Sequence, residues 1–326
     1  VSGLVHRAAG GPVKVNPCSA GDAAFATEPA HDSELLRAYG ALGSLPGVQT
    51  QRGCPLRCCY CTYPLIEGRR SRRRTGAEVV REMRKLLSLG IKFTFIVDSV
   101  FNTSTEHVAE VCEALASAGL DMEWQCFLRP CNLSRELLGL MRRAGMRNVE
   151  FGSDSFSDPV LRRYGKGFTF EEVRQSTQYA HELGIRFSHF LIFGGPGETP
   201  DSVEETLARA QSLPGAFFFA TIGMRIYPGT PLWGDLAPEK NGETAADYLV
   251  TPRFFLEQAF TVGGLYGRLR RLQRHCHNWA VGDPPPEFLE TVAKLRKRGV
   301  RGPMWDYIET LQRLAGTREG GGGNGL

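Results

Sequence analysis

The sequence has no run of 18 apolar residues, and its start at Val1–His6 has neither the basic nor the apolar region of a secretory signal peptide. We therefore expect no transmembrane segment and a cytoplasmic location. No charge of one sign dominates, because a formal net charge of +4 over 326 residues is too small to indicate a nucleic-acid partner. With 42% hydrophobic and 23% charged residues, the composition is that of an ordinary globular protein.

The nine cysteines lack the patterns of the common cysteine sites. A structural zinc site usually takes two C-x2-C pairs far apart, and no second pair exists here. Redox C-x2-C motifs use two cysteines, and disulfide frameworks belong to small secreted chains. Five cysteines show no ligand spacing and are interpreted as small buried residues: Cys18, Cys112, Cys126, Cys131 and Cys276.

The chain does contain three closely spaced cysteines, Cys54, Cys58 and Cys61. Thiolates at C-x3-C-x2-C can bind three irons of a [4Fe–4S] cluster, which leaves the fourth iron without a protein ligand. An open iron can bind a small chelating molecule, so such a cluster is a reaction centre rather than an electron relay. Cys59 is not counted as a ligand, because adjacent side chains point in different directions in an extended loop.

From about residue 47 to 230 the sequence repeats one unit, an apolar run followed by an amphipathic helix that ends at glycine. Several runs are almost continuously apolar, which is typical of parallel strands covered on both faces. The predicted strands are Gly47–Arg52, Lys92–Val97, Met122–Phe127, Arg147–Phe151, Ile185–Phe193 and Phe217–Ile226. This alternation predicts a parallel α/β barrel or open sheet, with every strand-to-helix loop at one end.

The predicted helices have recognisable start signals. Capping boxes are predicted at Thr75–Glu78, Thr103–Glu106 and Thr169–Glu172, and N-caps at Ser134 and Thr199. Further helices are predicted at Phe254–Leu272 and Glu287–Lys297. We divide the chain into a lead-in at 1–46, a core at 47–235, a helical C-terminal extension at 236–318 and a flexible glycine-rich tail at 319–326.

The cysteine spacing, with Tyr60 before the third cysteine, resembles the signature of the radical S-adenosylmethionine (radical SAM) superfamily. The resemblance implies that SAM binds the open iron through its amino and carboxylate groups. An electron then cleaves SAM and yields a 5′-deoxyadenosyl radical. It also implies the fold, a partial (β/α)6 barrel of parallel strands that is open on one side, here with a mostly helical C-terminal tail.

The same resemblance assigns SAM contacts to the loops that follow the strands, in the order Tyr60, Asp98, Arg129, Ser153, and Ile192 with Gly194 and Gly195. Tyr60 is expected against the adenine, and Ser153 at the ribose. Asp98 would bind the SAM ammonium, because the Gly-Gly-Glu motif often used there is missing. Arg129 has a guanidinium suited to a carboxylate. The alternatives are loop packing for Tyr60, a surface ion pair for Arg129 and a helix cap for Ser153.

Two other features of the sequence also have a structural interpretation. The basic run Arg69–Arg74 is either a solvated surface or an anion site for the substrate. His189 lies within an apolar strand and is interpreted as a hydrogen-bonded core residue rather than a ligand.

Beyond the superfamily, the segments Arg52–Pro55, Tyr60–Gly68, Gly152–Ser155, Pro196–Glu198 and Arg225–Thr230 resemble the cobalamin-dependent class. That class includes methyltransferases and the anaerobic magnesium-protoporphyrin ester cyclase type. A cobalamin domain is missing, because about 45 residues are too few for a Rossmann-like unit and no Asp-x-His-x-x-Gly motif occurs. The chain is therefore either a fragment, or an enzyme without its own cobalamin. Cobalamin is expected only if an upstream domain exists.

The leading hypothesis is a radical SAM enzyme that holds a [4Fe–4S] cluster and SAM and removes hydrogen from an unactivated carbon. Methylation and cyclisation both remain open, as does the small-molecule substrate, because many reactions share this fold. The expected partner is a reductase such as flavodoxin or ferredoxin. The alternative is a non-enzymatic iron–sulfur carrier or scaffold, which would be expected to ligate all four irons.

Overall fold

Short apolar segments form the strands of the main sheet, and an amphipathic segment follows almost every one of them. The computed structural model describes residues 5–7, 11–16, 29–41, 45–236, 242, 244–282, 290–292, 294–295, 298, 302–303, 305 and 307–308. Seven parallel strands lie in the order β3-β6-β7-β8-β9-β10-β13. Their bounds are Gly47–Val48, Phe93–Ile96, Glu123–Leu128, Met146–Asp154, Arg186–Phe193, Phe217–Ile222 and Trp279–Val281. The predicted parallel α/β fold is confirmed, and the C-terminal region adds a seventh strand.

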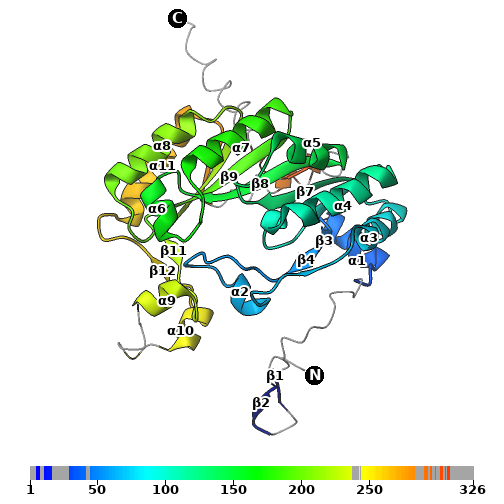
Figure 1. Cartoon of the computed structure of the whole chain (residues 1–326). Helices are drawn as coiled ribbons and strands as arrows, with labels where there is room; N and C mark the ends of the chain where they lie inside the picture. The colour runs from blue at the N-terminus through cyan, green and yellow to red at the C-terminus, as the bar shows by residue number, and fades with distance from the viewer. Residues whose placement is uncertain are drawn as a thin grey trace, which may run out of the picture.

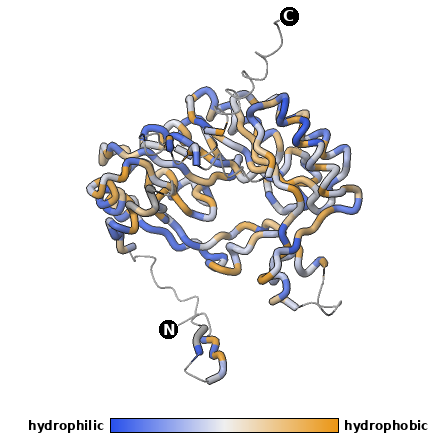
Figure 2. Tube along the Cα trace, turned by 180° about the vertical axis from the view of Figure 1, so that it is seen from behind, coloured by the Kyte–Doolittle hydropathy of each residue, from blue (hydrophilic) through white to orange (hydrophobic). Residues whose placement is uncertain are grey.

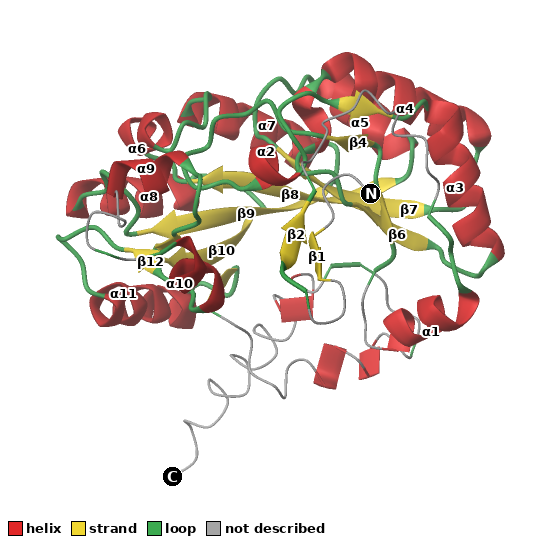
Figure 3. Cartoon of the chain, turned by 90° about the horizontal axis from the view of Figure 1, so that it is seen from below, coloured by secondary structure: helices red, strands yellow, loops and turns green. Residues whose placement is uncertain are grey.

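Helices cover one face of this sheet (Figures 1 and 3). They are α3 (Gly76–Ser88), α4 (Thr105–Ala118), α5 (Arg135–Arg143), α7 (Phe170–Glu182), α8 (Pro200–Gln211) and α11 (Val262–His275). Their apolar side chains form one core with the strand residues beneath them, including the fully buried Trp124, Phe151 and Phe187. Figure 2 shows hydrophilic positions along the outer turns of these helices.

The helix starts follow the predicted capping residues except at one position. Thr75 and Thr169 form capping boxes with Glu78 and Glu172, and Ser134 and Thr199 are N-caps. The capping box predicted at Thr103 is wrong. Thr103 ends the 3-10 turn η1 (Phe101–Thr103), so Ser104 becomes the cap of α4 and accepts from the His107 N–H.

In the described part of the C-terminal extension, one predicted helix is shorter than expected. The predicted helix Phe254–Leu272 begins only at Val262, because Phe254–Phe255 forms β12 and pairs with β11 (Met224–Arg225). Gly223, at a φ of 77°, ends the strand predicted through Ile226 and separates β10 from β11. Much of the predicted helix Glu287–Lys297 lies outside the described residues.

The remaining elements are short. In the lead-in, β1 (Val5–Arg7) pairs antiparallel with β2 (Val13–Val15), and α1 follows at Ser33–Ala41. Around the core lie α2 (Tyr63–Ile66), α6 (Asp158–Arg163), α9 (Pro231–Leu236) and α10 (Ala245–Val250). Among the described helices, none is long and apolar enough to cross a membrane.

Candidate functional site

The three predicted ligands lie in a loop whose two ends are fixed. The strand β4 (Gln51–Arg52) enters the loop and pairs antiparallel with β5 (Arg72–Arg73), which leaves it. Inside this base, the Gly53 N–H donates to Glu67 Oε2 at 3.0 Å, and the Cys54 N–H donates to the Gly68 carbonyl at 3.0 Å. Hydrogen bonds between its two ends therefore close the loop at its base. We call residues 53–71 the cysteine loop.

The middle of the cysteine loop is bound from two sides. The Cys59 N–H donates to the Tyr164 carbonyl at 2.9 Å, and the Cys59 carbonyl accepts from the Leu232 N–H at 2.9 Å. Gly165 has a φ of 71°, and a Cβ at this position would lie 2.5 Å from the Arg57 carbonyl oxygen. Only glycine fits both constraints. The segment after α6 thus lies directly against the backbone beside Cys58.

The thiols of Cys54, Cys58 and Cys61 are free and lie within electrostatic reach of one another. Burial raises the pKa of Cys58, and the nearby cations Lys166 and Arg129 act in the opposite direction. Burial also raises the pKa of Cys61, which a hydrogen bond from the Tyr63 N–H partly offsets. Iron requires thiolates, and cationic and N–H neighbours stabilise them. The donor set therefore fits three thiolate ligands.

Within the described parts of the chain, no three Cys, His, Asp or Glu side chains are placed to share a single metal ion. That criterion does not test the predicted cluster, because each thiolate of a [4Fe–4S] cluster binds a different iron. The assignment of Cys54, Cys58 and Cys61 as ligands stays a prediction.

Cys59, which the sequence analysis excluded from the ligands, has a structural environment. Its sulfur lies 3.7 Å from Met224 Sδ. It belongs to a buried apolar cluster with Val160, Tyr164, Met224, Ile226, Leu232, Trp233 and Tyr248. Its thiol therefore packs between the cysteine loop and the segment that follows β10.

A buried polar network lies beside Cys58. Asp154 Oδ2 accepts from Lys166 Nζ at 2.6 Å and from the Tyr60 hydroxyl at 2.5 Å. The side chains of Lys166 and Asp154 are each only 6% exposed. Asp154 adopts a φ of 65°, which is uncommon for a residue with a Cβ and often occurs at functional sites. Tyr60, predicted to contact adenine, is thus oriented by a carboxylate.

Arg129 joins the same network through backbone groups. Its guanidinium donates to the Lys166 carbonyl at 2.5 Å and lies 5.6 Å from the centre of the Phe168 ring. Its own N–H donates to Asn102 Oδ1 at 2.8 Å. The structure therefore places Tyr60 and Arg129 near Cys58, and their contacts with SAM stay predictions. Among the described residues the Arg129 guanidinium forms no surface ion pair, and part of its hydrogen-bonding capacity is used by the Lys166 carbonyl.

Asp98 does not fit its predicted role in binding the SAM ammonium. Its side chain is 1% exposed. One carboxylate oxygen accepts from the Thr50 and Gln51 N–H groups at 2.7 and 3.1 Å, and the other accepts from the Thr50 hydroxyl at 2.5 Å. These bonds fix the chain just before the cysteine loop. Asp98 is better explained as a structural residue.

We expect Asp98→Asn to lower the free energy of unfolding by about 1–3 kcal/mol, because an amide NH2 in place of Oδ2 cannot accept from the Thr50 hydroxyl, and to leave the affinity for SAM unchanged. Burial raises the pKa of Asp98 to about 7, so wild-type stability should fall as pH rises through about 7. The variant should lack the contribution of Asp98 to this slope, whereas Glu150 and Glu198, whose pKa values burial also raises to about 7, keep theirs. Urea unfolding at pH 6 and 8 and equilibrium dialysis with SAM check both points. Weaker SAM binding at unchanged stability would restore the ammonium role.

Ser153 likewise faces away from the predicted site. Its hydroxyl bonds to His189 Nδ1 at 2.8 Å, and His189 Nε2 bonds to the Thr177 hydroxyl at 3.1 Å. Ser153 and His189 are fully buried under the helices. The ribose contact predicted for Ser153 is therefore unsupported, while the prediction of a hydrogen-bonded core histidine agrees with this geometry. Burial lowers the pKa of His189 to about 3, so the ring is neutral.

The glycine-rich loop after β9 packs against Tyr164, whose carbonyl accepts from the Cys59 N–H in the cysteine loop. A Cβ on Gly195 would lie 2.0 Å from the Tyr164 hydroxyl, and Ile192 packs in the apolar cluster around Cys59. The Gly194 N–H donates to the Glu198 carboxylate, which braces the turn. Ile192, Gly194 and Gly195 therefore lie beside the cysteine loop, but their contact with SAM stays a prediction.

The basic run is partly structural. Arg74 is buried and pairs with Glu82, which also bonds to His31 at 2.9 Å. Arg72 donates to the Glu67 carbonyl at 2.8 Å. These two arginines hold the base of the cysteine loop rather than forming an anion site.

The sequence analysis missed Lys166, and it named Asp154 only as part of the polar segment Gly152–Ser155 expected near the SAM ribose. Strand alternation could have found Asp154, because Val149, Phe151 and Ser153 share the buried, helix-covered face and Asp154 follows them. Lys166 lies between two glycines with positive φ, Gly165 and Gly167. A lysine in such a turn carries no signal of burial, so its role depends on tertiary contacts.

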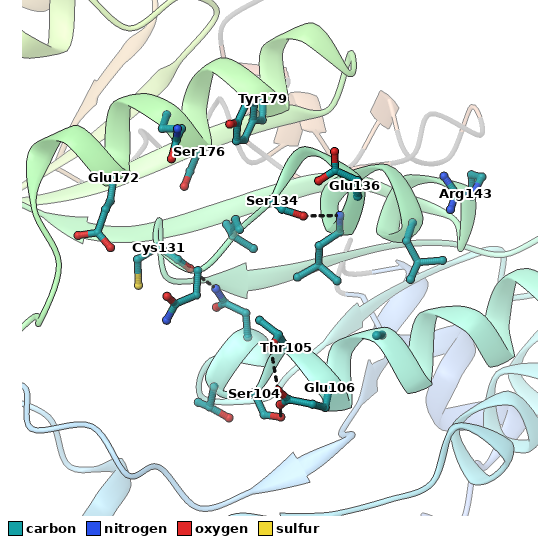
Figure 4. Close-up of a pocket in the computed structure, with 18 of the residues that line it drawn as sticks. Ser104, Thr105, Glu106, Cys131, Ser134, Glu136, Arg143, Glu172, Ser176 and Tyr179 are labelled. Atoms are coloured by element: carbon teal, nitrogen blue, oxygen red, sulfur yellow. Dashed lines mark hydrogen bonds between the residues drawn. The ribbon is translucent and has the colours of Figure 1, made fainter.

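A groove of about 1300 Å³ lies between the N-terminal ends of α4 and α5 and the helix α7. Figure 4 shows Ser104 and Ser134, which cap these helices, on opposite sides of it. Its charged lining residues are of both signs, Arg73, Arg143, Glu106, Glu136 and Glu172. Cys54, Cys58 and Cys61 do not line it, so it is separate from the candidate cluster site.

The sequence profile of the Radical SAM superfamily matches residues 48–210. The chain is 30% identical over 207 residues to an uncharacterised methyltransferase of Pyrococcus horikoshii, covering 63% of this chain and 45% of the relative. It is 27% identical over 218 residues to tryptophan 2-C-methyltransferase of Streptomyces laurentii, covering 63% and 36%. The chain thus spans less than half the length of these two curated relatives.

Among solved structures, the chain resembles TsrM, a radical S-adenosylmethionine methyltransferase from Kitasatospora setae. The TsrM structure with tryptophan and a SAM analogue gives a TM-score of 0.74 at 22% identity, covering 87% of this chain and 64% of TsrM. The structure with cobalamin and a [4Fe–4S] cluster gives 0.69 at 23% identity, covering 86% and 63%. This likeness confirms the predicted fold, and the profile confirms the predicted superfamily.

Proposed function

This chain belongs to the radical SAM superfamily, and we propose that it is an enzyme that holds a [4Fe–4S] cluster through Cys54, Cys58 and Cys61. The observation that carries the proposal is the set of three free thiols in one closed loop, with two cations beside Cys58. Three thiolates leave one iron open, which suits SAM binding and does not suit a pure electron carrier. When bound, the cluster supplies the electron that cleaves SAM.

The protein's own residues would place and neutralise these groups. Lys166 and Arg129 put positive charge beside the thiolates, and Asp154 fixes the Lys166 ammonium. We infer that Tyr60, Ile192, Gly194 and Gly195 contact the adenosine part of SAM, because they lie around the cysteine loop. Asp98 and Ser153 are not part of this proposal.

We further propose that the chain acts on an unactivated carbon of a small-molecule substrate. Methylation is favoured over cyclisation, because both curated relatives described above carry methyltransferase names. A small reductase such as flavodoxin or ferredoxin would supply the electron. Cobalamin is bound in the solved relative, and its binding here stays conditional on an upstream domain.

The test is SAM cleavage by the reconstituted, reduced chain under anaerobic conditions. We expect slow formation of 5′-deoxyadenosine and methionine even without substrate, measured by liquid chromatography and mass spectrometry. The Cys61→Ala variant should form neither product. A stable cluster whose electron paramagnetic resonance signal does not respond to SAM would instead support the carrier alternative.

A further inference from the structure

The cysteine loop and the two short strands at its base carry a large share of the chain's positive charge. Residues 52–74 contain seven of the 39 lysines and arginines and one of the 35 aspartates and glutamates, so this segment has a net charge of +6 and the remainder of the chain has −2. The one acidic residue, Glu67, is engaged at the base of the loop, where it accepts from the Gly53 N–H and from Gln49 Nε2. The positive charge is therefore not offset within the segment.

Three of these arginines, Arg57, Arg69 and Arg70, are exposed within the cysteine loop itself. Arg69 Nη1 donates to the Leu56 carbonyl at 3.2 Å, which holds its guanidinium beside the segment that carries Arg57. Arg57 directly precedes Cys58 in the sequence. Exposed positive charge therefore lies on the same stretch of chain as the proposed iron ligands.

Large apolar side chains are exposed in the same loop. The helix α2, which begins two residues after Cys61, presents Tyr63, Leu65 and Ile66, whose exposed fractions are 41%, 52% and 74%. Figure 1 shows α2 on the opposite side of the sheet from α5 and α7, away from the helix-covered core. Exposed apolar residues beside arginines are typical of protein–protein interfaces. We call these six residues the loop patch: Arg57, Arg69, Arg70, Tyr63, Leu65 and Ile66.

The position of the loop patch indicates what kind of partner it fits. Cys58 and Cys61 are half-buried and lie in the same loop, so a protein that binds the patch lies against the proposed cluster. Reductive cleavage of SAM uses one electron, which the chain has to receive from a donor. Electron transfer between proteins slows steeply with distance, so the donor has to dock close to the cluster.

We propose that the loop patch is the docking surface for a small acidic electron-carrier protein. The arginines attract and orient the negative surface of the carrier, and the exposed side chains of α2 supply an apolar centre for the contact. One electron passes from the reduced cofactor of the carrier to the cluster, and no bond forms or breaks in this step. The inference rests on the proposed function, because it names the partner of the same site.

The probe is flavodoxin, an acidic electron carrier, and cytochrome c is the comparison because it is a basic one. Binding to the reconstituted full chain is measured by biolayer interferometry under anaerobic conditions. We expect flavodoxin to bind, with an affinity that falls about tenfold between low and high salt because exposed charges are screened, and cytochrome c not to bind. Absence of flavodoxin binding, or equal binding of the two carriers, overturns the inference.

The triple variant Arg57→Gln/Arg69→Gln/Arg70→Gln removes the exposed positive charge of the loop. It should bind flavodoxin about tenfold more weakly, and its cluster should be reduced more slowly by flavodoxin in stopped-flow absorbance measurements. Reduction by dithionite, a small ion that needs no docking surface, should be as fast as in the wild type. Iron analysis checks that the variant is fully loaded.

The matched control removes the same charge from α11, one of the helices that cover the sheet. Arg270, Arg271 and Arg274 are exposed there, and Arg270→Gln/Arg271→Gln/Arg274→Gln should bind flavodoxin as the wild type does. Equal weakening by the two triple variants would show a general charge effect and would overturn the inference.

A second variant tests the apolar part of the patch without changing any charge. Ile66→Ser should keep its iron, because this side chain is 74% exposed, and should weaken flavodoxin binding severalfold at both salt concentrations. Unchanged binding would contradict a role for α2. A basic and apolar surface can also bind anionic lipid. If the arginine variant loses binding to phosphatidylglycerol vesicles but binds flavodoxin normally, the protein-docking inference is wrong.

The two proposals fail in different ways. Normal SAM cleavage with dithionite, together with flavodoxin binding that does not depend on the loop patch, contradicts the docking surface alone. Patch-dependent flavodoxin binding without SAM cleavage by either reductant contradicts the proposed function alone.

Discussion

Cys58→Ala is expected to reduce the iron and sulfide content of the reconstituted chain from about four of each to near zero, and to abolish SAM cleavage. Each thiolate binds its own iron, so the loss of one leaves the cluster with two protein ligands. Cys54→Ala and Cys61→Ala should behave in the same way. Colorimetric iron and sulfide assays and the visible spectrum measure the effect.

Cys59→Ala is the matched control, because it removes an adjacent thiol from the same loop. This thiol packs against Met224 Sδ in an apolar cluster, so we expect full iron loading and a stability change within about 1 kcal/mol. Full loading of Cys58→Ala, or loss of iron in Cys59→Ala, would show that the ligands are assigned wrongly.

Lys166→Met is expected to lower the free energy of unfolding of the iron-free chain by about 3–5 kcal/mol, because it leaves the buried Asp154 carboxylate without its cation. The two side chains are each 6% exposed and lie 2.6 Å apart. Tyr60 would still donate to Asp154, but a phenol does not neutralise a carboxylate. Urea unfolding followed by circular dichroism gives the change.

The chain contains a matched exposed pair of the same residue types. Lys92 Nζ lies 2.5 Å from Asp121 Oδ2, with the side chains 43% and 78% exposed. Lys92→Met should therefore cost less than about 1 kcal/mol. In addition, the double variant Lys166→Met/Asp154→Asn should lose less than the sum of the single variants. Similar losses for Lys92 and Lys166, or additive effects, would contradict a buried, coupled pair.

The strands and most helix starts could be predicted because their signals are local. Apolar runs bounded by glycine identified all six core strands, and Thr75 and Thr169 cap helices where their sequences indicate. The seventh strand could not be predicted in the same way. Trp279–Val281 has only three residues, and its strand character comes from pairing with β10. Likewise, Phe254–Phe255 became a strand through pairing with β11.

The sequence predicts the three cysteines of the candidate site, and it says less about the residues around them. Residue type and spacing define thiolate ligands, so Cys54, Cys58 and Cys61 could be named without coordinates. The SAM contacts predicted for Asp98 and Ser153 stay untested, but both side chains already have partners within the protein, which sequence alone does not reveal. Lys166 was missed because its burial depends on Asp154, which lies on a separate element.

The order of the strands has a consequence for synthesis on the ribosome. Each strand of the main sheet lies beside the one that precedes it in the main sheet along the chain, from β3 to β13. A growing chain can therefore add each new strand to an edge that already exists, without waiting for distant segments. Among the described residues, the last additions are β13, which pairs with β10, and Trp305, which stacks on Phe217. The strand order therefore suits folding that proceeds from the N-terminal strand onwards.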